Sequence, residues 1–471
     1  MKIRIQMIIE EDDGQLTPPT EIFTLERDTL QLETLGLCLE ESRQLLFNLQ
    51  EKLTEQQANV FVAQHQHCPG CQRTYSRKGW HHLRLHTLFG ELTLTSPRFY
   101  ACSCENTKRS SFSPLAQRLQ ERNTPELLYL QTKWAALMPY DVTSKLLEEI
   151  LPIEVSPTSL RRHLKKTAER CEQELGDEQL CYIEGSPAEW DELPDTDGPM
   201  TVGLDGGYIH LRDEHNRKAG SVEVIVGKSI PCEAQAKCFG FVSGYDEKPR
   251  RRIFETLKSQ GLQMNQSLLF LSDGGDTVRN LQFYLSPHSE HLLDWFHITM
   301  RLTVMQQMVK GLPEKLWENY TRTRLAEQLD QIKWLLWHGN LFRALPTITH
   351  LCDILDMLQE ECPFPNIPKL LKAVSEFDSY ITANRDFIPN YGDRYRYGEI
   401  ISTAFVESTV NQVISKRFVK KQQMRWTKRG AHLLLQVRVK VLNNEWRTTF
   451  TRWYPHMQRS QEPERLALKV A

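Results

Sequence analysis

Long apolar runs are absent from this sequence, and so are internal repeats and low-complexity tracts. No stretch approaches the roughly 18 apolar residues that a membrane-spanning helix needs. The first residues, MKIRIQMIIEEDDG, alternate apolar and polar side chains and then turn acidic, without the apolar core and cleavage site of a signal peptide. We therefore expect an N-terminal strand, no membrane partner and a cytoplasmic location.

A disulfide framework is also missing, although the chain contains 11 cysteines. Seven are scattered without regular spacing, as buried cysteines usually are: Cys38, Cys171, Cys181, Cys232, Cys238, Cys352 and Cys362. The other four, Cys68, Cys71, Cys102 and Cys104, form two close pairs at the ends of a predicted hairpin. They predict a structural zinc site that folds a small module. The tight Cys-x-Cys spacing leaves four alternative ligands: His67, His81, His82 and His86.

The net charge is only −2, but the charges are segregated along the chain. Between Glu172 and Asp197 there are ten acids and no lysine or arginine. Between Lys416 and Arg447 there are ten basic residues and one acid. This basic segment favours a polyanionic partner such as DNA, with a solvated helix surface as the ordinary alternative.

The 471 residues predict two to four domains of the α+β class. Glycine-punctuated β-runs followed by a helix and an apolar strand predict a mixed sheet with helices on its faces. The expected segments are a strand and helix region (1–65), a zinc-ribbon-like module (66–115), a helix-turn-helix module (120–175), an acidic linker (176–199), the mixed-sheet domain (200–298), an all-helical segment (299–390) and a last helix with a basic C-terminal region (391–471).

Residues 120–175 resemble a helix-turn-helix unit. Ser156 and Pro157 form a strong helix start, after which Leu160 and Leu164 face inward. Thr158 and Ser159 lie at the leading end, where a recognition helix meets DNA. The outward-facing basic residues, our candidates for DNA contacts, are Arg161, Arg162, Lys165 and Lys166. An ordinary three-helix bundle with a basic surface is the alternative.

Three carboxylates are candidates for metal chemistry. Asp205 and Asp273 each follow a β-run and precede two glycines, which let a backbone or a phosphate approach. Either one alone is more often part of a glycine turn. Glu407 lies at the edge of an apolar helical stripe, where a solvated acid is the commoner role. Two strand carboxylates and one helix carboxylate can hold two divalent ions, and hard oxygen ligands suit Mg²⁺ or Mn²⁺.

Two further motifs flank Glu407. Basic residues follow it and are candidates for contacts with the DNA backbone: Lys416, Arg417, Lys420, Lys421, Arg425, Lys428 and Arg429. The preceding run, YGDRYRYGE, interleaves Tyr391, Tyr395 and Tyr397 with Arg394 and Arg396. Such a run either stacks on unpaired bases and grips phosphates or is an ordinary structural segment.

Four blocks in this order resemble those of bacterial insertion-sequence DDE transposases of the ISKra type, on the Mutator-like branch: VGLDGGYIH, LSDGGDTVRN, LLDWFHI and FVESTVNQVISKRFVKKQQMRWTKRGAHLLLQVR. The resemblance covers nearly the whole chain. It implies a ribonuclease-H-like catalytic domain with Asp205, Asp273 and Glu407 as its triad, interrupted by an all-helical insertion. Asp294 and His297 match an Asp-x-x-His signature and would support the site. Asp276 is either a helper or an ordinary acid of the first helical turn.

The sequence thus predicts a DNA transposase that binds element ends, cleaves them and joins them to target DNA, as a homodimer or larger assembly in the cytoplasm at the bacterial nucleoid. One alternative is a DNA-binding regulator derived from a transposase, against which three intact carboxylates count. A nuclease of the same fold that cleaves without joining is the other.

Overall fold

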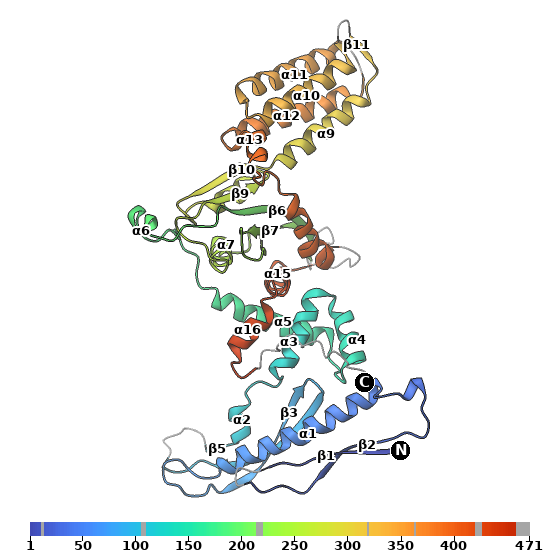
Figure 1. Ribbon diagram of the computed structural model, residues 1–471, viewed down its shortest axis with the longest axis vertical. Helices are drawn as coiled ribbons and strands as arrows, with labels where there is room; N and C mark the ends of the chain where they lie inside the picture. The colour runs from blue at the N-terminus through green and yellow to red at the C-terminus, as the bar shows by residue number, and fades with distance from the viewer. Residues whose placement is uncertain are drawn as a thin grey trace. The chain divides into compact units, whose positions relative to one another are not determined.

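The computed structural model describes residues 1–10, 14–104, 110–212, 220–317, 320–361, 364–419 and 426–457. The chain divides into two compact units, and Figure 1 labels many of their helices and strands. Unit 1 comprises Met1–Thr167 and Asn444–Ala471, and unit 2 comprises Ala168–Asn443. The division falls within helix α5 (Pro157–Glu174). Among the described residues, no helix is both long enough and apolar enough to cross a membrane.

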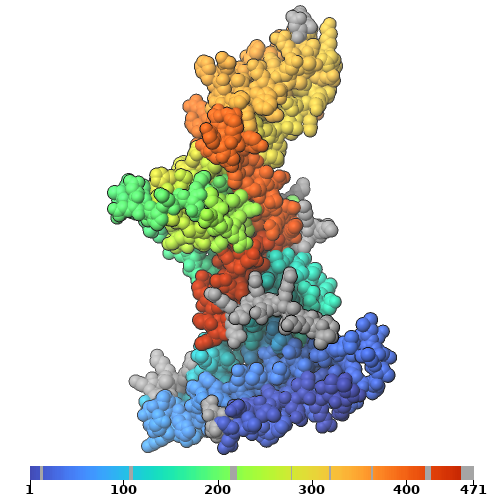
Figure 2. All heavy atoms as spheres, viewed as in Figure 1, coloured from blue at the N-terminus to red at the C-terminus, as the bar shows by residue number. Residues whose placement is uncertain are grey.

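Unit 1 begins with two antiparallel strands and a long helix. These are β1 (Lys2–Met7), β2 (Thr20–Glu26), the 3-10 helix η1 (Leu32–Thr34) and α1 (Leu39–Gln64). The predicted hairpin follows as β3 (Arg77–Thr87) and β4 (Gly90–Tyr100), with β5 (Ser111–Phe112) paired to β4. Ala58 of α1 packs with Leu83 and Leu94 of the hairpin, so helix and hairpin share a small core, and their blue segments adjoin in Figure 2.

The elements that follow in the described part of unit 1 are helices, as predicted for residues 120–175. The helices are α2 (Pro114–Arg118), α3 (Pro125–Leu137), α4 (Tyr140–Ile150), the first part of α5, and α16 (Trp446–Trp453). Leu160 and Leu164 of α5 are buried, as their spacing predicts. The indole of Trp446 donates a hydrogen bond to the hydroxyl of Thr132 at 3.1 Å, which fastens the C-terminal helix to α3.

Unit 2 contains the predicted mixed sheet. Its strands are β6 (Met200–His210), β7 (Ser221–Ile230), β8 (Lys237–Val242), β9 (Leu268–Ser272) and β10 (Ser289–Leu293). Their spatial order is β10-β9-β6-β7-β8. β7 is antiparallel to its two neighbours, β6 and β8. β9 runs parallel to β6, and β10 runs parallel to β9. An α+β chain with a mixed sheet is therefore confirmed.

Helices cover both faces of this sheet. On one face, Val202 and Leu204 share a core with Ile253 of α7 (Pro249–Lys258). The opposite face of β6 is covered by α14 (Ala404–Val410) and by the π-helical segment η4 (Asn411–Val419), which lie beside β6 and β7 in Figure 1. The remaining elements around the sheet are α8 (Asp276–Arg279), the 3-10 helix η2 (Asn280–Gln282) and α15 (Lys428–Leu442).

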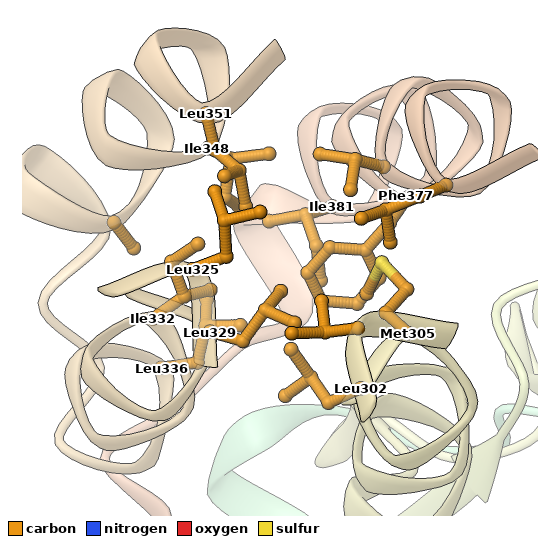
Figure 3. Close-up of a cluster of buried hydrophobic side chains, with 14 of the residues drawn as sticks. Leu302, Met305, Leu325, Leu329, Ile332, Leu336, Ile348, Leu351, Phe377 and Ile381 are labelled. Atoms are coloured by element: carbon orange, nitrogen blue, oxygen red, sulfur yellow. The ribbon is translucent and has the colours of Figure 1, made fainter. Parts of the chain in front are cut away.

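The segment between β10 and α14 has a core of its own. Its helices are α9 (Trp295–Lys310), α10 (Arg322–Trp337), α11 (Leu341–Glu361), α12 (Ile367–Ala383), the 3-10 helix η3 (Arg385–Phe387) and α13 (Tyr391–Arg396). Side chains of α9, α10, α11 and α12 point toward one another in Figure 3, including the predicted stripe of α10. The expectation of an all-helical segment is wrong in one detail, because β11 (Lys315–Trp317) pairs with β12 (Tyr320–Thr321).

The acidic stretch expected to be an exposed linker contains one short helix and one anchor. The helix is α6 (Pro187–Asp191). The anchor is Tyr182, which is 1% exposed and whose ring centroid lies 4.6 Å from that of Phe254 on α7. This segment is therefore partly attached to the core of unit 2.

Candidate functional site

Asp205, Asp273 and Asp294 have equivalent positions in the register of three neighbouring strands, the last two directly after their strands. The parallel pairing of β6 with β9 reaches Gly203 and Leu271, and Asp205 and Asp273 each follow two residues later. The two aspartates therefore have equivalent positions just beyond the last paired residues, and the charge of Asp273 is among the causes that raise the pKa of Asp205. Asp294 continues the series, because its backbone N–H donates to the carbonyl of Ser272 at 2.9 Å.

The sequence predicts that Asp205 lies at the end of its strand, and this prediction is wrong. Asp205 lies in the middle of β6. Beyond Gly203 the strand loses its parallel neighbour and continues to His210 through antiparallel pairing with β7. Asp205 is therefore held by regular backbone hydrogen bonds while its side chain lies where the sheet opens toward β9. A strand fixes a carboxylate more rigidly than a glycine turn would.

The glycines around Asp205 seat a helix. A Cβ atom at Gly203 would lie 2.3 Å from Val406, and one at Gly207 would lie 2.8 Å from Ile414. Side chains alternate along a strand, so Asp205 shares the face of Gly203 and Gly207. The carboxylate of Asp205 thus belongs to the face that the Glu407-bearing helix covers. Our interpretation that glycines here admit a phosphate is replaced, for Gly207, by close packing against η4.

Asp205 and its neighbours influence one another electrostatically. Burial is the main cause that raises the pKa of Asp205, and the negative charges of Asp273 and Asp294 raise it further. The backbone N–H of Gly206, 2.7 Å from the Asp205 carboxylate, and the electrostatic effect of His297 act in the opposite direction and lower this pKa. Such a concentration of negative charge is what a cation site offers.

Asp273 lies in an exposed turn whose backbone is fixed. The hydroxyl of Ser272 accepts a hydrogen bond from the N–H of Gly274 at 3.2 Å, and the carboxylate of Asp273 accepts one from Gly275 at 3.1 Å. Asp276 is 80% exposed and ion-paired with Arg279 in its own helix, so it acts as an ordinary acid of the first turn.

Asp294 is fully buried and ties two helices together. Its carboxylate accepts from the N–H of Phe296 at 2.9 Å, at the start of α9. It also accepts from the N–H of Thr403 at 3.1 Å and from the Thr403 hydroxyl, at the start of α14. His297 lies 3.7 Å from the same carboxylate. Because these bonds occupy its oxygens, Asp294 fixes the starts of α9 and α14 rather than offering a free ligand.

Glu407 is exposed on α14, one turn after Thr403, whose carbonyl accepts from its backbone N–H at 3.2 Å. Within the described ranges, only two groups of side chains have three or more potential ligand atoms all within 4.8 Å of one another, and the Asp205, Asp273 and Glu407 set is not one of them. The three carboxylates therefore do not all lie within 4.8 Å of one another.

One of the two groups is the predicted cysteine cluster: Cys68, Cys71, Cys102 and Cys104. The sulfur atoms of Cys68 and Cys104 are 3.2 Å apart, and those of Cys71 and Cys102 are 3.5 Å apart. A disulfide needs about 2.05 Å, whereas a tetrahedral zinc ion with bonds of about 2.3 Å spaces its sulfurs roughly 3.8 Å apart. The hydrogen bond from the backbone N–H of Cys104 is the main cause that lowers the pKa of Cys102 to about 7. The four thiols can therefore hold a metal such as zinc without a histidine.

The other group, Glu172, Asp246 and His432, surrounds the buried guanidinium of Arg252. Arg252 lies 2.5 Å from Glu172 and 2.5 Å from Asp246. Burial opposes ionisation, but hydrogen bonds from His432 and Arg252 lower the pKa of Glu172 to about 2. A cation already fills this cluster, so it is an ion-pair network that joins α5, α7 and α15.

The basic candidates separate into surface and interior residues. Arg161, Arg162, Lys165 and Lys166 are exposed on α5, as predicted. Lys416 and Lys428 are also exposed, and Arg429 pairs with Glu169 at 2.6 Å. The expectation that Arg417 contacts DNA is wrong, because its side chain is fully buried beside the ring of Trp426. Three more candidates, Lys420, Lys421 and Arg425, lie outside the described residues.

The tyrosine and arginine run before α14 is mostly structural. Tyr391 is fully buried and donates its hydroxyl to the carbonyl of Leu293 at 2.7 Å. Arg394 pairs with Glu290 and Glu399, and Arg396 pairs with Asp393. Tyr395 and Tyr397 are exposed, at 65% and 83%, and so is the side chain of Arg396, at 61%. Arg394 is engaged within the fold, whereas these three side chains face solvent.

No family model matches the chain, and a search of curated proteins finds no match. Sequence reasoning missed the seating of α14 and η4 on β6, for which a signal existed: glycines stand two positions before and two positions after Asp205.

Proposed function

We propose that this protein is a DNA transposase of the bacterial insertion-sequence type. Unit 2 would cleave and join DNA, and unit 1 would bind the element ends. The observation that carries the proposal is that Asp205 on β6 and Asp273, directly after the parallel strand β9, have equivalent positions in the register, while α14, which bears Glu407, covers the face of β6 that Asp205 shares. A regulator that only binds DNA has no use for this arrangement.

The strand order supports a ribonuclease-H-like fold for unit 2. Within the sheet, the three antiparallel strands β6, β7 and β8 come first along the chain. β9 then pairs parallel with β6, and β10 pairs parallel with β9, which gives the order β10-β9-β6-β7-β8. In that fold the carboxylates come from the first strand, the fourth strand and the last helix. In this chain Asp205 lies on the first strand of the sheet, Asp273 directly follows the fourth, and Glu407 lies on α14 after the helical segment.

The donor set suits Mg²⁺ or Mn²⁺. Asp205, Asp273 and Glu407 offer only oxygen ligands, and two ions are held by ligands that surround them, so the ligands need not touch one another. When bound, such ions activate water or a 3′-hydroxyl and stabilise the leaving oxygen of a phosphodiester. Asp294 and His297 support this site, with Asp294 holding the start of α14 in place.

Unit 1 supplies two features that suit DNA ends. The exposed basic side chains of α5 begin at Arg161, close after the helix N-cap, where the hydroxyl of Ser156 accepts from the N–H of Ser159 at 3.1 Å. This is the end of a recognition helix that meets DNA. The cysteine cluster, loaded with zinc, would fold the adjoining hairpin module.

The test is a strand-transfer assay with purified protein, labelled DNA carrying the candidate element ends, a target plasmid and Mg²⁺. We expect joined product from the natural chain and from Asp276→Ala, a matched control three residues from the site, but none from Asp273→Ala. Specific end binding without joined product from any of these proteins would support the regulator instead. Cleaved ends that are never joined would support a nuclease.

A further inference from the structure

The helical segment between β10 and α14 contacts the turn that carries Asp273. Gly274, the next residue, has a φ of +85°, and a Cβ atom there would lie 2.4 Å from the side-chain oxygen of Asn384 and 2.7 Å from Leu293. Asn384 immediately follows α12. The end of this helix therefore presses directly against the Asp273 turn.

Asn384 is buried in a way that calls for an explanation. It is 5% exposed, and its side-chain N–H donates to the carbonyl of Tyr380 at 2.9 Å. Its side-chain oxygen is buried without a hydrogen-bond partner among the described residues, as is the hydroxyl of Tyr380 one turn earlier. Unpaired buried polar atoms are rare, and they persist where the surrounding structure requires the residue for another reason.

Tyr380 gives separate evidence that α12 reaches the carboxylates. Burial is the main cause that raises its pKa, and the negative charges of Asp273 and Asp294 raise it further. Arg301 of α9 stacks on its ring, with the guanidinium carbon 4.3 Å from the centroid. The last turn of α12 is thus electrostatically coupled to the site as well as packed against its turn.

Two further contacts of this turn act on its backbone N–H groups. The hydroxyl of Ser272 accepts from the N–H of Gly274, and the carboxylate of Asp273 accepts from the N–H of Gly275. The side chains that pack against Gly274 are Leu293, on β10, and Asn384. Of these two, Asn384 is the one that belongs to the helical segment.

We propose that Asn384 is a positioning residue for Asp273, so that the helical segment sets the place of this carboxylate through the end of α12. The inference rests on the proposed function, in which Asp273 holds a divalent ion. It assigns the helical segment a role in forming the site, distinct from any role in binding DNA or in assembly.

The experiment compares Asn384→Ala with Asn340→Ala in the full chain. Asn340 provides a matched control, because its side chain caps the start of α11 by accepting from the N–H of Arg343 at 3.3 Å. Mn²⁺ affinity is measured by calorimetry, with Asp273→Ala identifying the heat that belongs to this site. Mn²⁺-dependent nicking of a supercoiled plasmid is measured in parallel.

We expect Asn384→Ala to weaken Mn²⁺ binding about 10–100-fold, the usual loss when a residue that orients a ligand is removed. Asn340→Ala should bind as the natural chain does. Wild-type affinity and nicking in Asn384→Ala would overturn the inference while leaving the proposed function intact, and so would an equal loss in Asn340→Ala. Unchanged metal binding and nicking in Asp273→Ala would overturn the proposed function and the inference together.

A second pair of variants keeps the inference testable if Asn384→Ala folds poorly. Gly274→Ala places a methyl group against Asn384, and Gly274→Ala/Asn384→Ala removes that contact while keeping the same backbone strain. We expect the double variant to bind Mn²⁺ more tightly than Gly274→Ala alone. An equal or weaker affinity in the double variant would contradict the contact.

Discussion

Replacing Asp205 with asparagine tests two properties of the site. One is how far the buried negative charge destabilises the metal-free protein, and the other is whether that charge is needed to bind the metal. Burial raises the pKa of Asp205, and Asp273 and Asp294 add to the effect, so the ionised carboxylate is held at a cost when no cation is bound. Asparagine keeps the shape and an oxygen for the N–H of Gly206. We therefore expect Asp205→Asn to be at least as stable as the natural chain without metal.

The expected increase in stability on metal binding follows from the linkage between ligand binding and folding. A metal present at a hundred times its dissociation constant stabilises the folded state by about 2.7 kcal/mol. For a unit of the size of Ala168–Asn443, each kcal/mol shifts the melting temperature by roughly 2–4 °C. Saturating Mg²⁺ should therefore raise the melting temperature of the natural protein by about 5–10 °C. The same addition should leave Asp205→Asn almost unchanged.

The assay is differential scanning calorimetry of both proteins with and without Mg²⁺, at neutral pH and constant ionic strength. Asp276→Asn is the matched control, since that acid is exposed and paired in its own helix. It should keep the full metal-induced shift. The reasoning would be refuted by a metal-free Asp205→Asn protein that melts well below the natural chain, or by a metal shift that survives the substitution.

Three further predictions concern other parts of the molecule. Purified protein should contain about one zinc ion per chain, and Cys71→Ser should lose it, as atomic absorption would show. Gly203→Ala should destabilise unit 2 by about 1–3 kcal/mol in urea unfolding, because its methyl group would meet Val406 at 2.3 Å; an unchanged midpoint would contradict the close packing of α14. Burial lowers the pKa of His163 to about 4 from 6.5, so unit 1 holds this histidine neutral. Its contribution to stability is fully present above pH 6.5 and is lost as the pH falls toward 4, by up to about 3 kcal/mol. His163→Gln should remove that part of the pH dependence of unfolding.

Local patterns predicted the elements of the fold well. Apolar runs bounded by glycines marked β6 and β9, and the leucine spacing of α10 placed four side chains in one core. The cysteine pairs at the ends of a hairpin came together as expected. These features depend on periodicity and on short-range spacing, which a single sequence displays directly.

Long-range contacts decided what the sequence could not predict. Arg417 and Arg438 belong to a run of basic residues that looks solvated, yet both are buried. Arg438 donates to the carbonyl of Val413 at 2.8 Å, in the π-helical segment, so its charge is used to close the backbone there. Neither the π-helical segment nor its partner arginine has a local signature, because each depends on the other.

The fold also explains how a carboxylate 134 positions after Asp273 can belong to the same site. The helical segment leaves the sheet at Asp294 and returns at Thr403, and these two residues are joined directly by hydrogen bonds. The N–H of Trp295 donates to the carbonyl of Ile401 at 3.2 Å, beside the first junction. Entry and exit are therefore tied at one point, and the segment can be long without displacing α14. Asp294 holds Thr403, and Thr403 begins the helical turn that carries Glu407. The position of Glu407 is therefore fixed at this junction and does not depend on the length of the helical segment. Such a large segment is therefore compatible with the proposed metal site, and the contact of Asn384 with Gly274 is the route that we propose for its effect on Asp273.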